Sequence, residues 1–331
     1  MNSHLMIDLP DPIDSERIVE FPDPIGSEDR GHHFGEFEIH AINAAIEAGR
    51  PLLVRGEPGI GKSQLARAAA FALGRVYLTH VVDSQTNARD LLWQYDAVKR
   101  LADAQVARAA PDLDRLGEAN YLQPGPLWWA FSPESARDQA IRARCPPIEP
   151  GPGASWERGS VVLIDEIDKA ESELPNGLLE VLGARQFTPM RWPVPIRVGS
   201  PAPLIVITSN EERALPAPFT RRCFVLNLKL PKEDTLLREH LISRGRTHFP
   251  DANPDVLAEA ARLLVNDRAE AEARRIRPKP GQAEYLDLVR AVLGQTRDVK
   301  AAAERLTMQL DLLKAVSRYT LKKHPEPDDL G

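Results

Sequence analysis

The sequence predicts an α/β fold: a three-layer αβα domain with a mainly parallel sheet, followed by an all-α lid. Short apolar runs alternate with helical patterns between residues 51 and 208, an order typical of parallel strands covered by helices on both faces. A glycine-rich turn joins one of these runs to a helix. Beyond Pro231 only helical periodicity remains, which indicates a separate helical part.

Bulk properties exclude several classes of protein. The chain has 331 residues, 43% of them hydrophobic, which is enough for a sizeable core. No apolar stretch is long enough to span a bilayer and the N-terminus lacks a secretory signal, so we expect a soluble, cytoplasmic protein that stays off the membrane. The net charge of -6 argues against a nucleic acid as the main partner. Cys145 and Cys223 have no CxxC partner and are expected to be reduced thiols.

The first 34 residues are rich in Asp, Glu and Pro and contain a near-duplication, at 9–13 and 21–25. We interpret residues 1–34 as a flexible acidic arm. The alternative is that the two copies are docking motifs for a partner.

The α/β part begins with a helix from Phe37 to Ala48, which Gly49 ends. The elements expected after it are strand 51–55, helix 62–73, strand 76–82, helix 126–144, strand 160–164, helix 174–182 and strand 204–208. The lid is expected to contain helices at about 232–244, 254–266, 282–293 and 299–322. We therefore divide the chain into the arm, a domain at 35–230 and a lid at 231–331.

The strongest motif is the glycine-rich turn between the first strand and its helix. It consists of Gly56, Glu57, Pro58, Gly59, Ile60, Gly61, Lys62 and Ser63. This is the full Walker A pattern of a P-loop in the setting that the motif requires, so a structural glycine turn is the weaker interpretation. The glycines let backbone N–H groups face phosphates, Lys62 reaches the β- and γ-phosphates, and Ser63 ligates Mg²⁺. We predict that this loop, with the adjacent Gln64, binds ATP and Mg²⁺ as in P-loop NTPases.

A second motif is the apolar run 161–164 followed by Asp165 and Glu166. Ligands of open α/β sheets bind at the carboxyl ends of the strands, so both carboxylates are expected beside the P-loop. Asp165 is then a Mg²⁺ ligand, and Glu166 orients and polarises the attacking water. A solvated strand end is the alternative for such a pair taken alone.

Two further features follow along the chain. Asn210 comes just after the strand 204–208, where its amide can bond the attacking water or the γ-phosphate; the alternative is an asparagine chosen for the turn. Arg221 and Arg222 are either a surface cluster or, in a ring motor, the source of an arginine that enters the neighbour's site. We favour Arg222, with Arg221 second.

These motifs, in this order, resemble the AAA+ superfamily, and within it the MoxR-type ATPases. The similarity covers roughly residues 35 to 330. It is carried by Asp90-Leu91-Leu92, Pro124-Gly125-Pro126-Leu127-Trp128, Ile164-Asp165-Glu166-Ile167-Asp168-Lys169-Ala170, and Leu215-Pro216-Ala217-Pro218-Phe219 leading into Arg221-Arg222-Cys223.

The resemblance implies roles that the residues alone do not. Asn210 would be sensor 1 and the pair Arg221 and Arg222 the trans-acting finger. Residues 83–125 would be the helix-2 insert of this clade, and 187–198 the hairpin before sensor 1. Either Arg277 or Lys279 would be sensor 2, although a solvated basic loop is the alternative there.

The resemblance also implies partners. Family members assemble as homo-oligomeric, usually hexameric rings and often work with a von Willebrand A domain protein to remodel or activate a client. The leading hypothesis is therefore a ring-forming, Mg²⁺-dependent ATPase acting on a protein client. The alternatives are a nucleotide-controlled switch in a bacterial conflict or signalling system, and a nucleic-acid-stimulated motor subunit. The aromatic residues of the insert region, such as Trp128 and Trp129, are expected to pack rather than to contact a client or bases.

Overall fold

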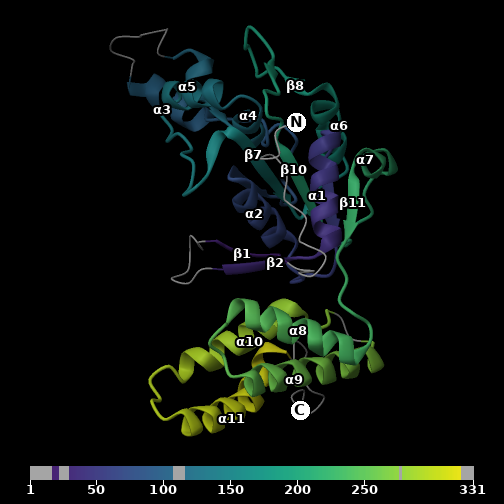
Figure 1. Cartoon of the computed structure of the whole chain (residues 1–331). Helices are drawn as coiled ribbons and strands as arrows, with labels where there is room; N and C mark the ends of the chain where they lie inside the picture. Colours follow the sequence, from purple (N-terminus) through teal and green to yellow (C-terminus); the bar gives the residue numbers. More distant parts are fainter. Residues whose placement is uncertain (1–16, 22–29, 107–115, 276–277, 322–331) are drawn as a thin grey trace, which may run out of the picture. The chain divides into compact units, whose positions relative to one another are not determined.

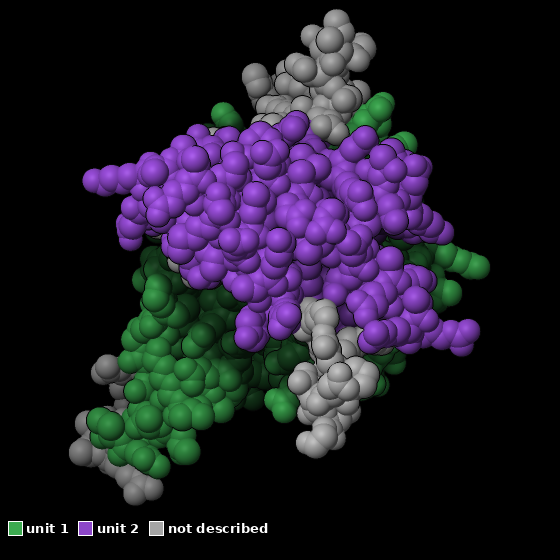
Figure 2. Space-filling model, turned by 90° about the horizontal axis from the view of Figure 1, so that it is seen from below, with its two compact units in different colours: residues 1–15, 35–55, 63–227 green, residues 16–34, 56–62, 228–331 purple. Residues whose placement is uncertain are grey.

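The computed structural model describes residues 17–21, 30–106, 116–275 and 278–321 (Figure 1). The chain divides into two compact units, coloured separately in Figure 2. Unit 1 holds residues 35–55 and 63–227, and unit 2 holds 16–34, 56–62 and 228–331, with residues 1–15 assigned to unit 1. The P-loop residues 56–62 thus group with the helical part, whereas we predicted them in the domain 35–230. The predicted domain limits remain predictions.

Unit 1 is built on a five-stranded sheet in which every neighbouring pair is parallel (Figure 1). The strands, in their order across the sheet, are β11 (Phe224–Asn227), β3 (Leu52–Arg55), β10 (Leu204–Ser209), β7 (Ser155–Asp165) and β4 (Arg75–Val81). All six residues of β10 are buried, as are Val161 to Ile164 of β7. Such continuous apolar runs form strands whose two faces are both covered, which confirms the predicted α/β fold.

Helices flank this sheet, and smaller pieces extend from it. Helix α1 (Glu36–Ala48) precedes β3, and the helices α2 (Lys62–Leu73), α6 (Glu173–Ala184) and α7 (Ala217–Arg222) lie in the connections between strands of the sheet. The predicted insert region contains β5 (Trp93–Tyr95) paired with β6 (Leu122–Pro124), and α3 (Ala97–Val106). The predicted hairpin contains β8 (Gln186–Phe187) paired with β9 (Ile196–Arg197).

One predicted helix is divided in two. Instead of a single helix over 126–144, the structure has α4 (Pro126–Phe131) and α5 (Pro133–Arg142). Pro133 is the cause, because it has no N–H for a continuing helix and its ring clashes with the preceding turn. The single helix was therefore a wrong prediction.

The tryptophans of this region pack inside unit 1. Trp128 has no exposed surface, and its ring contacts those of Phe187 and Trp192. Trp129 is 3% exposed and stacks on Trp156. The packing interpretation of Trp128 and Trp129 is confirmed.

Unit 2 contains the lid helices. Between Leu228 and Leu321, the described residues form α8 (Asp234–His248), α9 (Pro254–Ala273), α10 (Gln282–Gln295) and α11 (Ala302–Thr320). Their core includes Leu241, Tyr285 and Leu313, none of which has exposed surface. No helix in the described part of the chain combines the length and the apolar character that a membrane span needs.

Part of the predicted arm is ordered structure in unit 2. Within the segment 1–34 that we expected to be flexible, β1 (Arg17–Phe21) and β2 (Arg30–Phe34) form an antiparallel hairpin. Arg244 of α8 donates a hydrogen bond to the carbonyl of His33, and Phe34 is fully buried. The hairpin is stabilised by this packing against α8, which composition does not reveal. The duplicated motifs at 9–13 and 21–25 lie outside the described residues, apart from Phe21.

Candidate nucleotide site

The carboxyl ends of two adjacent strands bring the predicted catalytic residues together. β7 ends at Asp165, and its neighbour β10 ends at Ser209, with Ile164 paired to Ile207. The next strand, β3, pairs with the other edge of β10 and leads through the P-loop into α2. The carboxyl ends of the strands therefore bring together residues 165–166, Ser63 and Asn210.

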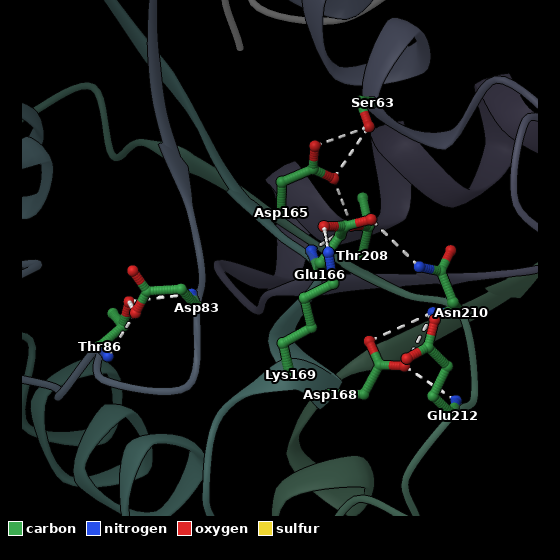
Figure 3. A network of polar contacts seen from close by, with 10 residues as sticks. All are labelled: Ser63, Asp83, Thr86, Asp165, Glu166, Asp168, Lys169, Thr208, Asn210 and Glu212. Atoms are coloured by element: carbon green, nitrogen blue, oxygen red, sulfur yellow. Dashed lines mark hydrogen bonds and ion pairs between the residues drawn. The ribbon is translucent and has the colours of Figure 1, made fainter.

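Two hydroxyl groups hold the Asp165 carboxylate (Figure 3). Ser63 Oγ donates to it, 2.8 Å from Oδ1 and 2.9 Å from Oδ2. Thr208 Oγ1 donates to Oδ1 at 2.5 Å and accepts the backbone N–H of Glu166 at 2.8 Å. Thr208 is fully buried, so this hydroxyl fixes both the carboxylate and the turn that follows it.

Ser63 and Asp165 fit a Mg²⁺ ion. Their oxygen atoms lie within hydrogen-bond distance of each other, so both can face a single cation, and oxygen ligands suit a hard ion. Mg²⁺ keeps several waters and takes the remaining ligands from phosphates, so it does not need a cage of protein groups. The described residues contain no cluster of three or more His, Cys, Asp or Glu side chains arranged for a metal.

The Glu166 side chain is held at both of its oxygens (Figure 3). Asn210 Nδ2 donates to Oε1 at 3.2 Å, and Lys169 forms an ion pair with Oε2. Hydrogen bonding to Glu166 is the main cause of a raised pKa of Lys169. Glu166 adopts a left-handed backbone conformation, with φ of 60°, which is uncommon for a residue with a side chain. The structure thus places the predicted base in direct contact with the predicted sensor 1.

The Asp168 side chain holds the backbone next to Asn210. Its side chain is 2% exposed and accepts the backbone N–H of Asn210, at 3.2 Å to each oxygen, and that of Glu212 at 2.9 Å. The buried carboxylate therefore fixes the loop that carries Asn210. We did not predict this role. The signal in the sequence was a third acidic residue soon after the apolar strand, which taken alone indicates only a polar turn.

The P-loop residues lie in unit 2 and have the backbone that the motif requires. Gly59 and Gly61 have φ of 74° and 99°, values that side chains disfavour. Lys62 is 6% exposed, and its Nζ donates to the carbonyls of Gly56 at 2.8 Å and Glu57 at 2.9 Å. Pro58 and Ile60 complete the turn, and Gln64 lies half-buried in the first turn of α2.

Lid residues contact the P-loop within unit 2. Arg268 of α9 forms an ion pair with Glu57 at 3.0 Å and donates to the carbonyl of Pro280 at 2.6 Å. At the start of α10, Ala283 N donates to the carbonyl of Gly59 at 3.1 Å, and the Gln282 amide lies beside Gly61. These contacts were not predicted, because nothing in the spacing relates them to the P-loop.

Of the two residues proposed for sensor 2, only Lys279 is in the described part of the chain. Lys279 forms an ion pair with Glu272. Arg277 falls outside the described residues. The role of sensor 2 therefore remains a prediction.

Arg221 and Arg222 lie near the amino ends of the strands, whereas Asp165 lies at a carboxyl end. They end α7, and Phe224, which follows them, pairs with Leu52 at the start of β3. Since β3 rises by about 3.3 Å per residue, its two ends are about 10 Å apart. Both arginines are exposed, and in the described part of unit 1 the structure does not bring them to Glu166 or Asn210.

The fold and the P-loop define a nucleotide-binding protein of the AAA+ class. The family described as AAA domain (dynein-related subfamily) matches residues 51–244, more than half of the chain. The chain therefore belongs to the AAA domain family, whose members are nucleotide-hydrolysing ATPases. A comparison with curated proteins gave no match.

Solved structures of two bacterial proteins are similar to the chain. A variant of RuvB from Thermotoga maritima is 16% identical, with a TM-score of 0.44, over 85% of this chain and 67% of RuvB. NtrX from Brucella abortus, in complex with ADP, is 14% identical, with a TM-score of 0.44, over 93% of this chain. The chain spans 58% of the length of NtrX.

Proposed function

We propose that the chain is a Mg²⁺-dependent ATPase of the MoxR type that assembles into a hexameric ring of identical subunits. Hydrolysis would be coupled to remodelling or activation of a protein client, with a von Willebrand A domain protein as a candidate partner. The proposed site consists of the P-loop, the Mg²⁺ ligands Ser63 and Asp165, the base Glu166 and the sensor Asn210.

The observation that carries this proposal is the set of contacts around the two carboxylates. Asp165 meets the Ser63 hydroxyl, while Glu166, the next residue, meets the Asn210 amide. These contacts support a role for Asp165 in holding Mg²⁺ beside the phosphates and for Glu166 in orienting water. Bound Mg²⁺ would supply charge neutralisation of the phosphates.

The proposal of a ring depends on where the arginine pair lies. Because Arg221 and Arg222 are at the far edge of the sheet, they are available to a second copy of the chain rather than to their own Glu166. An arginine supplied in trans increases hydrolysis by about 10³ to 10⁵-fold in nucleotide hydrolases that use one.

Replacement of Glu166 tests the proposed catalytic role. The variant Glu166→Gln keeps the size of the side chain but cannot accept a proton, so we expect it to bind ATP with unchanged affinity and to lose turnover by at least about 10²-fold. Glu157→Gln, an exposed position on the same strand, is the matched control. Wild-type turnover in Glu166→Gln would refute the proposed base.

ATPase assays of the wild-type protein distinguish the proposal from its alternatives. Turnover measured with and without duplex or single-stranded DNA should be the same for a motor that acts on protein. Strong stimulation by DNA would favour the nucleic-acid motor. ATP binding without turnover in the wild type would favour the nucleotide-controlled switch.

A further inference from the structure

Arg50 contacts the end of the helix that carries the predicted finger. It follows Gly49, the left-handed C-cap of α1, and precedes β3. Its Nε donates to the carbonyl of Arg222 at 2.9 Å, and its Nη2 donates to the carbonyl of Arg221 at 2.5 Å. The same guanidinium lies 5.4 Å from the centre of the Phe224 ring. A single side chain thus contacts three of the four residues from 221 to 224.

These contacts stabilise α7, which is too short to be stable on its own. The helix has six residues, too few to be stable alone, and its last carbonyls have no partner within the helix. A guanidinium carries several donors in a fixed plane, so it can satisfy two neighbouring carbonyls at once. Its positive charge is also favourable at a helix C-terminus.

Other groups hold the rest of α7 and the chain just after it, where Phe224 N donates to the carbonyl of Pro51 at 2.8 Å. Phe219 is fully buried, and Arg55 Nη2 donates to Thr220 Oγ1 at 3.3 Å. The side chains of Arg221 and Arg222 are exposed, and Arg222 Nη1 makes one long hydrogen bond, 3.5 Å, to the carbonyl of Leu179 in α6. Arg50 binds the backbone carbonyls of both arginines, and so fixes the point from which their side chains leave the helix.

We propose that Arg50 is a positioning residue for the arginine finger. It holds the C-terminal turn of α7 so that the side chain of Arg222, or of Arg221, enters the nucleotide site of a second copy. Arg50 itself does not touch the nucleotide. This inference depends on the proposed ring ATPase, because only a shared site gives the finger a target.

Mixed rings test the proposal directly. A finger donor carries Glu166→Gln and has lost its own base. A base donor carries Arg221→Ala and Arg222→Ala and has lost its fingers. Each is inactive alone, but their mixture should hydrolyse ATP wherever the fingers of the first meet the base of the second.

Arg50→Met is then placed in one partner at a time. In the finger donor we expect it to lower the activity of the mixture by about 10 to 100-fold, as a misplacement of about 1 Å can. In the base donor it should change the activity by less than about twofold, because that chain contributes no finger. Arg137→Met, at an exposed arginine of α5 that pairs with Glu149, is the control in both partners.

The asymmetry separates positioning from folding. Equal losses in both partners would mean that Arg50 has a structural role, and that result overturns the proposal. No loss in either partner, or a loss only in the base donor, overturns it as well. If the unmodified mixture is inactive while the wild type hydrolyses ATP, the trans-acting finger itself is wrong, and the role of Arg50 falls with it.

Discussion

Replacing Asp168 with alanine should lower both catalysis and stability. The carboxylate is 2% exposed and accepts the N–H groups of Asn210 and Glu212. Alanine leaves both N–H groups without an acceptor. A hydrogen bond to a charged group contributes about 1.5 to 3 kcal/mol, and the two bonds share one carboxylate, so we expect a loss of about 2 to 5 kcal/mol in the free energy of unfolding.

The kinetic effect should fall on kcat. Without the bond from its N–H group, Asn210 can shift relative to Glu166, and a displacement of about 1 Å lowers a rate by about 10²-fold. The KM for ATP should stay within about threefold, because the hydrogen bonds of Asp168 go to the backbone of Asn210 and Glu212. A loss in kcat with little change in KM is the signature of a group that acts on the transition state.

Steady-state ATPase assays and thermal unfolding of four proteins measure both effects. They are the wild type, Asp168→Ala, Asn210→Ala and the double variant. Because Asp168 acts on catalysis through Asn210, the kcat of the double variant should equal that of Asn210→Ala, while its stability should be lower. Glu171→Ala, at an exposed position, is the control. The reasoning is refuted if Asp168→Ala keeps the kcat of the wild type, or if it lowers the kcat of Asn210→Ala further.

Three further predictions concern other contacts. Lys169→Met should leave the stability nearly unchanged, because its pair with Glu166 is exposed to solvent, and should raise kcat severalfold by freeing an oxygen of Glu166; a slower enzyme contradicts this. Arg268→Met should lower the free energy of unfolding by about 1 to 3 kcal/mol in urea titration, since the Pro280 carbonyl loses its donor; an unchanged midpoint contradicts this. Burial raises the pKa of Cys223 to about 11, so iodoacetamide at pH 8 should modify it only after unfolding, as mass spectrometry can show.

Features that depend on neighbouring residues could be predicted from the sequence. The apolar run 161–164 predicts a buried strand because its residues share one environment, and the glycines of the P-loop predict a turn because few other residues adopt their backbone angles. The fold class follows from such local patterns and their order. The direct contact of Glu166 with Asn210 follows from one further rule, that parallel strands end at the same edge of a sheet.

Contacts between residues far apart in the chain could not be predicted in this way. Arg50 and Arg221 are separated by 171 positions, and Arg268 and Glu57 by 211. The sequence around an exposed arginine that precedes a strand does not predict which carbonyls its guanidinium will bind. Asp168 is closer to its partner, but its role depends on burial, and a charged residue in a turn predicts exposure instead.

The direction of the strands relates the proposed catalytic residues to the proposed ring. Asp165 and Asn210 follow the carboxyl ends of β7 and β10, where a parallel sheet binds its ligands. The chain then turns back through α7, because β11 must start at the amino edge to run parallel to β3. A short helix makes this return, and its last residues are the two arginines, close to the amino end of β3. In the ring that we propose, the connection that a parallel sheet requires would also present the proposed finger to the next subunit, and the position of that finger would depend on the contacts that hold the end of α7.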